Sequence, residues 1–133
     1  MTEPTLDEVL RDQRDAIRVA VQARMRGDET VAAIAAQRDL RDNDLTSQVI
    51  GFWLEAITSD IELGSTAALE QNIGWLVRLR TGQALPFDDA MVMRMFEAIS
   101  EEIDAALESD ELRGEYARYR TAVETLITAS FPG

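Results

Sequence analysis

The stretch that decides the fold class is residues 50–65, IGFWLEAITSDIELGS. With successive residues about 100° apart on a helical wheel, its large apolar side chains fall within one narrow arc, which is typical of a helix packed on a core. These side chains are Ile50, Trp53, Leu54, Ile57 and Ile61. Gly64 and Ser65 combine a helix stop with a common N-cap residue, so we predict a second helix that turns sharply away.

The rest of the chain has the same helical character. It contains only seven glycines and three prolines, no segment alternates convincingly with period two, and strong helix formers dominate. We predict helices over residues 5–26, 28–35, 45–63, 66–80, 88–108 and from 109 or 110 onward. Residues 38–44 are predicted to form a loop or a frayed connection. Residues 81–87 are predicted to be a second break, because Gly82 suits a C-terminal cap and Pro86 forbids continuation.

Capping residues and apolar periodicity support these helices. Thr5 to Glu8 form a capping box. The other predicted N-caps are Asp28, Ser65, Asp88 or Asp89, and Ser109 or Asp110. The predicted core positions are Leu6, Leu10, Ile17 and Val21 on the first helix, Leu69, Ile73, Leu76 and Val77 on the fourth, Val92, Met95, Phe96, Ile99, Ile103 and Leu107 on the fifth, and Leu112, Tyr116, Tyr119, Val123, Leu126 and Ile127 on the last.

The length of 133 residues fits one domain, residues 1–133, that can bury a sizeable core without disulfides or a structural metal. The sequence shows no repeat, low-complexity tract or linker. We therefore predict an all-α, single-domain fold of five or six helices, globin-like as the first choice. The alternative is an antiparallel four-helix bundle with extra N-terminal helices.

The chain contains no histidine, cysteine or lysine, and its 13 cationic side chains are all arginine. This composition removes the common proton shuttle, the thiolate nucleophile and the amine of Schiff bases, and no familiar catalytic motif is present. We therefore expect a protein that is not an enzyme and that uses no cofactor. Without histidine, di-iron bundles and histidine-ligated haem are excluded. Arginine in place of lysine is explained by GC-rich coding and suggests a bacterial source.

The net charge of −12 argues against nucleic acid as a partner, because phosphate binding needs a basic patch. The apolar runs are too short to span a bilayer, so no membrane association is expected. Residues 1–8 carry acidic charge and no apolar region of the secretory type. We expect a cytoplasmic protein.

The third and fourth helices are apolar on a second side as well. This second cluster comprises Val49, Phe52, Ala56 and Leu63 on the third helix, with Ala68, Trp75 and Leu79 on the fourth. One interpretation is that these residues pack against the first two helices. The other is a dimer or partner interface formed by Val49, Phe52, Ala56, Trp75 and Leu79, since tryptophan and phenylalanine are common interface anchors.

Three further groups have both structural and functional interpretations. Met91, Met93 and Met95 fit core filling better than a binding groove. The carboxylates of Glu97, Glu101, Asp104 and Glu108 share one side of the fifth helix, where a solvated surface is favoured over a site for a cation or a basic partner. Tyr116, Tyr119 and Arg120 fit a core with a polar rim better than a catalytic cluster.

From Trp53 onward the sequence resembles the non-haem, globin-like N-terminal domains of RsbR-type stressosome regulators. The resemblance is carried by GFWL at 51–54 through DIELG at 60–64, by a helix ending near RTG at 80–82, and by the break LPFDD at 85–89 before an amphipathic helix. It implies a haemless sensory or scaffold domain that is dimeric through its helices. Because no STAS domain follows residue 133, we expect a stand-alone relative or an excised domain.

Two functions follow as hypotheses. The first is a non-enzymatic bacterial signalling or regulatory module that forms a homodimer and binds a protein partner of its pathway through the Phe52 and Trp75 faces. The alternative is a receptor for an apolar small molecule, held within the bundle by Trp53, Met95 and Phe96 together with Trp75.

Overall fold

The computed structural model describes residues 4–29, 42–83 and 89–130. Within these ranges the regular structure is entirely helical, which confirms the predicted all-α class. The helices are α1 (Leu6–Met25), α3 (Asp42–Leu63), α4 (Ala67–Gln83), α5 (Asp89–Ala106) and α6 (Asp110–Ser130). The short helix predicted over residues 28–35 falls almost wholly outside the described residues.

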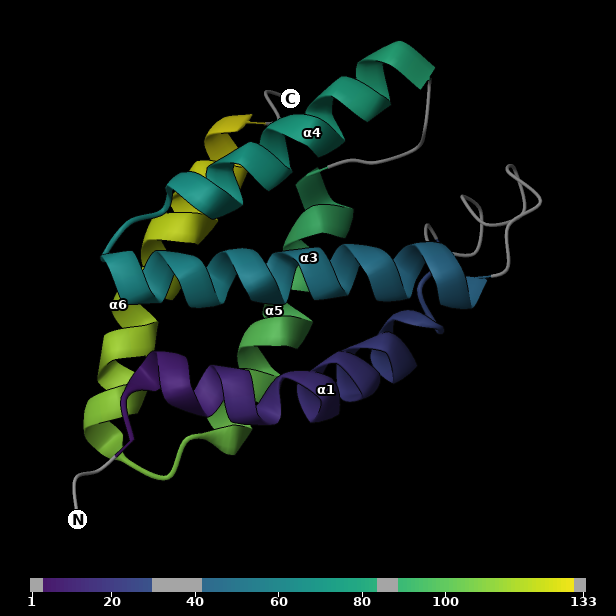
Figure 1. The fold of residues 1–133 in the computed structure, drawn as a ribbon. Helices are drawn as coiled ribbons and strands as arrows, with labels where there is room; N and C mark the ends of the chain where they lie inside the picture. Colours follow the sequence, from purple (N-terminus) through teal and green to yellow (C-terminus); the bar gives the residue numbers. More distant parts are fainter. Residues whose placement is uncertain (1–3, 30–41, 84–88, 131–133) are drawn as a thin grey trace.

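The helices are arranged in two layers (Figure 1). In this view α3 crosses the centre, with α1 packed along one side of it and α4 along the other. Behind this layer, α5 crosses α3 and packs on α1, and α6 packs on α5 and α4. The central position of α3 explains why its sequence is so rich in apolar residues, since it has neighbours on several sides.

The helix boundaries follow from local capping. Thr5 precedes α1, and its Oγ1 atom accepts a hydrogen bond from the Glu8 backbone N–H at 3.4 Å, as the capping box predicts. At the end of α3, Gly64 has a φ of 67°, a left-handed conformation that glycine adopts without steric cost. The Ser65 backbone N–H donates to the Asp60 carbonyl at 2.9 Å, which is the Schellman pattern of a helix C-terminus.

Three predicted boundaries are wrong. The loop placed at residues 38–44 ends too late, because α3 begins at Asp42, where acidic residues favour a helix N-terminus. The helix α4 continues through Gln83, past Thr81 and Gly82, because an isolated glycine weakens a helix without ending it. Finally, α5 ends at Ala106, short of the predicted residue 108.

The predicted core is largely confirmed. Every core residue predicted for the first and fifth helices is buried, and Trp53 of α3 meets Phe96 of α5 with ring centroids 6.3 Å apart. The predicted core residues that are only half-buried are Ile61, Val77, Leu112 and Leu126. The periodicity therefore identified the inward side of each helix, with errors at the edges of the apolar arcs.

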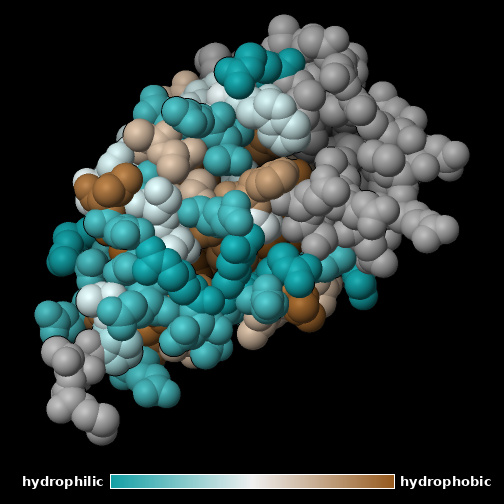
Figure 2. Space-filling model, in the orientation of Figure 1, coloured by the Kyte–Doolittle hydropathy of each residue, from teal (hydrophilic) through white to brown (hydrophobic). Residues whose placement is uncertain are grey.

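The surface is predominantly hydrophilic on the face shown in Figure 2. Hydrophilic residues dominate over α1, and larger hydrophobic patches come to the surface nearer α3 and α4. Among the described residues, no helix combines the length and apolarity needed to cross a membrane.

Candidate functional site

The second apolar cluster of α3 and α4 is divided between the core and the surface. Val49 and Ala56 are buried, whereas Phe52 is 53% exposed and Trp75 is 40% exposed. Leu63, at the end of α3, is 75% exposed. The side chain of Leu79 lies outside the described residues. The packing interpretation therefore fits Val49 and Ala56, and the aromatic residues are the part of the cluster that reaches solvent.

The residues proposed to hold an apolar ligand form part of the packed core. Trp53, Met95 and Phe96 are each at most 2% exposed. Their side chains come from α3 and α5 and contact other buried residues of the same cluster. This arrangement gives them a structural role in holding the two layers together.

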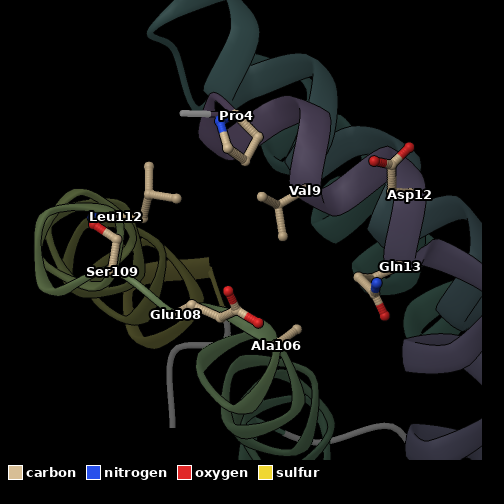
Figure 3. A pocket seen from close by; sticks show the side chains of 8 residues that line it. All are labelled: Pro4, Val9, Asp12, Gln13, Ala106, Glu108, Ser109 and Leu112. Atoms are coloured by element: carbon tan, nitrogen blue, oxygen red, sulfur yellow. The ribbon is translucent and has the colours of Figure 1, made fainter. Parts of the chain in front are cut away.

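A surface cleft of about 550 Å³ lies elsewhere, between the start of α1 and the corner that joins α5 to α6 (Figure 3). Its lining comprises Pro4, Val9, Asp12, Gln13, Ala106, Glu108, Ser109 and Leu112. Val9, Leu112 and the carboxylate of Glu108 project into the space between the helices. The cleft combines apolar walls with carboxylates, whereas two smaller clefts along α1 are lined by arginines as well as carboxylates.

The sequence did not identify the buried carboxylate of Asp60, which is 2% exposed. It accepts hydrogen bonds from the backbone N–H groups of Ala68 at 2.9 Å and Leu69 at 3.1 Å, and from the Tyr119 hydroxyl at 2.9 Å. The two N–H groups belong to the first turn of α4, where a negative charge is favourable. Asp60 thus links α3, α4 and α6. Its sequence signal was a carboxylate at the edge of the apolar arc of α3, next to Trp53 on the helical wheel.

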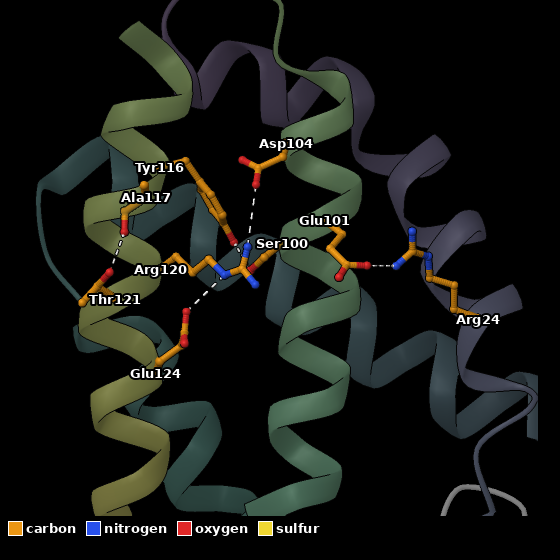
Figure 4. Close-up of polar contacts among 9 residues, drawn as sticks. All are labelled: Arg24, Ser100, Glu101, Asp104, Tyr116, Ala117, Arg120, Thr121 and Glu124. Carbon is orange, nitrogen blue, oxygen red and sulfur yellow. Dashed lines mark hydrogen bonds and ion pairs between the residues drawn. The ribbon is translucent and has the colours of Figure 1, made fainter. Parts of the chain in front are cut away.

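A second buried hydrogen bond joins α5 to α6. The hydroxyls of Ser100 and Tyr116 are 2.8 Å apart (Figure 4). Burial raises the pKa of Tyr116 above its usual range, although the bond to Ser100 acts in the opposite direction. Burial and the bond to Asp60 likewise raise the pKa of Tyr119. Neither phenol is disposed to ionise near neutral pH, so both serve as hydrogen-bonding core residues.

Tyr116, Tyr119 and Arg120 have different partners and do not gather around one carboxylate. Tyr119 reaches a carboxylate, Asp60, whereas the half-buried Arg120 extends from α6 toward α5 (Figure 4). There it pairs with Glu124 at 3.1 Å and Asp104 at 3.7 Å. Among the described residues every buried side-chain polar atom has a hydrogen-bond partner, so this region is a satisfied structural network.

The acidic side of α5 is only partly a free solvated surface. Glu101 pairs with Arg24 of α1, and Asp104 pairs with Arg120 of α6. Within the described ranges, neither Glu97 nor Glu108 forms an ion pair, and no group of three or more acidic side chains is placed to hold a metal ion. Two of the four carboxylates therefore link α5 to neighbouring helices, and Glu97 and Glu108 are exposed at the surface.

The outer face of α4 differs from these regions. Its exposed residues are Ala67, Glu70, Gln71, Trp75 and Arg78, with Gly74 half-buried among them. They recur every three or four residues, so they share one side of the helix. The opposite side carries Leu69, Ile73 and Leu76, all in the core. An exposed tryptophan on such a face, beside a helix that exposes Phe52, is the candidate site of this protein.

No protein-family model, curated protein sequence or solved structure matches the chain.

Proposed function

We propose that the protein is a non-enzymatic signalling or regulatory module that acts through homodimerisation and partner binding. The observation that carries this proposal is the exposure of two aromatic side chains, Phe52 at 53% and Trp75 at 40%, on the adjacent helices α3 and α4. Aromatic residues are enriched in the buried centres of protein interfaces, where they contribute large contact areas. The buried polar groups already have partners within the fold, which leaves this surface as the best-supported working feature.

The proposal extends to bacterial stress signalling in the cytoplasm, as a relative of the globin-like RsbR-type domains. Its support is the order of a long aromatic helix, α3, a sharp break at Gly64, and then α4 and the amphipathic helix α5. The receptor alternative has less support, because Trp53, Met95 and Phe96 are occupied in packing α3 against α5. Native mass spectrometry of protein purified from its own source would reveal a bound apolar molecule if the alternative were correct.

Sedimentation of the purified protein tests the proposal. We expect a dimer, and we expect Phe52→Asp and Trp75→Asp to yield folded monomers, because an aspartate would have to be desolvated at the interface. Circular dichroism establishes that each variant is folded. The matched control is Val19→Asp, since Val19 is 58% exposed but lies on α1. A folded dimer of both aspartate variants would remove this surface from the interface, and a monomeric wild-type protein would refute homodimerisation.

A further inference from the structure

The outer face of α4 has a charge distribution that is complementary to itself when reversed. Glu70 and Arg78 lie at its two ends, and Gly74 lies midway, four residues from each. Four residues correspond to about 6 Å along the helix axis, so the Cα atoms of Glu70 and Arg78 are about 12 Å apart along the helix. Within the described residues, neither Glu70 nor Arg78 forms an ion pair. This surface therefore carries one unpaired charge of each sign.

The glycine at the middle of this face is not required by the fold of a single chain. A glycine within a helix lowers stability relative to alanine. A Cβ atom added at Gly74 would lie in ordinary van der Waals contact, 3.5 Å from the Nη1 atom of Arg78, at the end of a flexible side chain. The monomer thus has room for a larger residue at this position. When the flexible Arg78 side chain turns away from Gly74 toward a partner, the absence of a Cβ atom allows the backbone of another helix to approach closely.

We infer that the partner of this face is α4 of a second copy of the chain, packed antiparallel about a two-fold axis at Gly74. A two-fold interface uses the same surface on both copies, so a residue four positions before the axis faces one four positions after it. Glu70 of each copy then lies opposite Arg78 of the other. The two unpaired charges of one chain are matched by the two of the next, with Trp75 of both copies beside the axis.

Charge favours this face over the rest of the surface for contact with a second copy of the chain. The chain as a whole has a net charge of −12, so two copies repel each other over most of their surfaces. Among its exposed residues, however, the α4 face is neutral, because Glu70 is balanced by Arg78. When the helix of a second copy runs in the opposite direction, its Arg78 lies opposite Glu70 of the first copy, and its Glu70 lies opposite Arg78. The inference rests on the proposed homodimer and specifies its geometry.

Charge reversal tests this geometry directly. Glu70→Arg alone and Arg78→Glu alone each replace two attractive contacts in the dimer with two repulsive ones. We expect each to raise the dissociation constant by roughly tenfold or more, given typical energies of exposed ion pairs. A mixture of the two variants should form heterodimers, because one copy then carries arginine at both positions and the other carries glutamate at both. The double variant Glu70→Arg/Arg78→Glu should dimerise as the wild type does.

Sedimentation and native mass spectrometry of the separate and mixed variants provide the measurements. Arg118→Glu is the control for net charge, since Arg118 is exposed on α6 and the substitution equals Arg78→Glu in charge. The antiparallel pairing is overturned if mixing the two variants restores no dimer, or if both variants dimerise as the wild type does. The proposed homodimer survives either result so long as the wild-type protein is dimeric, so the two failures are distinguishable.

Discussion

The 17 residues of α4 form an inner face that packs in the core and an outer face that is exposed to solvent. On the inner face, Leu69, Ile73 and Leu76 are at most 1% exposed, and Asp60 holds the first turn of the helix from α3. On the outer face, Trp75 is 40% exposed beside charged residues that have no partner within the described part of the chain. The inner face attaches α4 to its own chain, so the outer face is available to another molecule without unfolding.

This comparison separates folding from assembly. Substitutions on the inner face should lower the free energy of unfolding, and substitutions on the outer face should alter association while leaving the monomer stable.

Asp60→Ala should have the largest effect, because it removes a carboxylate that accepts three hydrogen bonds in the core. The Ala68 and Leu69 backbone N–H groups and the Tyr119 hydroxyl would lose their acceptor. We expect a loss of about 3–5 kcal/mol in the free energy of unfolding, measured by urea denaturation. Asp12→Ala on the exposed side of α1 is the control and should change stability by less than about 0.5 kcal/mol. A loss below about 1 kcal/mol for Asp60→Ala would contradict its role in attaching α4.

Ile73→Ala and Gln71→Ala compare the two faces at positions two residues apart. Ile73 is 1% exposed, so its truncation should leave a cavity and lower the free energy of unfolding by about 2–4 kcal/mol. Gln71 is exposed on the outer face, and its truncation should alter stability by less than about 0.5 kcal/mol. Thermal or urea unfolding at a concentration where the protein is monomeric makes the comparison. Equal losses for the two variants would show that the outer face also packs within the monomer.

Alkaline pH should destabilise the protein through its two buried tyrosines. The pKa of Tyr116 and that of Tyr119 are both raised in the folded state, so the folded protein keeps phenolic protons that the unfolded chain releases above about pH 10. The stability that these groups contribute is fully present below pH 10 and declines as the pH rises above it. The expected slope is about 1.4 kcal/mol per pH unit for each tyrosine.

The two tyrosines are the side chains that titrate in this pH range, because lysine, cysteine and histidine are absent and arginine stays protonated. Urea denaturation at several alkaline pH values gives the slope, and ultraviolet absorbance of the tyrosinate gives the titration. Tyr119→Phe should reduce the slope by about half. A stability that stays constant from pH 10 to pH 11 would show that the two phenols titrate normally in the folded protein.

The inward side of each helix could be predicted from the sequence, because the spacing of apolar residues within a helix marks the side that is buried. The apolar arc of Ile50, Trp53 and Ile57 identified the core face of α3 without any knowledge of its neighbours. Capping at Thr5 and the turn at Gly64 were also predicted, because a single residue with a specific backbone or side-chain preference determines each. These features depend on residues within a few positions of one another.

The features that the sequence did not predict depend on distant residues. Asp60 and Tyr119 are 59 positions apart, and periodicity carries no signal for their hydrogen bond. The division of the second apolar cluster also depends on the neighbouring helices, because Val49 and Ala56 are covered in the fold while Phe52 is not. Amphipathic periodicity shows that a helix has two apolar sides, but only the packing shows which of them remains exposed.

Arg14→Ala should have the smallest effect, and it tests whether a charge paired within the chain behaves differently from Arg78. Arg14 of α1 donates to Glu55 of α3 at 2.7 Å, and both side chains are about half exposed. Exposed ion pairs contribute about 0.2–1 kcal/mol, so the loss in the free energy of unfolding should lie in that range and shrink at high salt.

The same substitution should leave the sedimentation coefficient unchanged, because Arg14 is already paired with a residue of its own chain. Arg78→Ala provides the contrast: it should weaken dimerisation while changing the stability of the monomer by less than about 0.5 kcal/mol. If Arg14→Ala weakened the dimer as much as Arg78→Ala, the interface would include α1. In that case α1, like α4, would have one face that packs on its own chain and another that contacts the second copy.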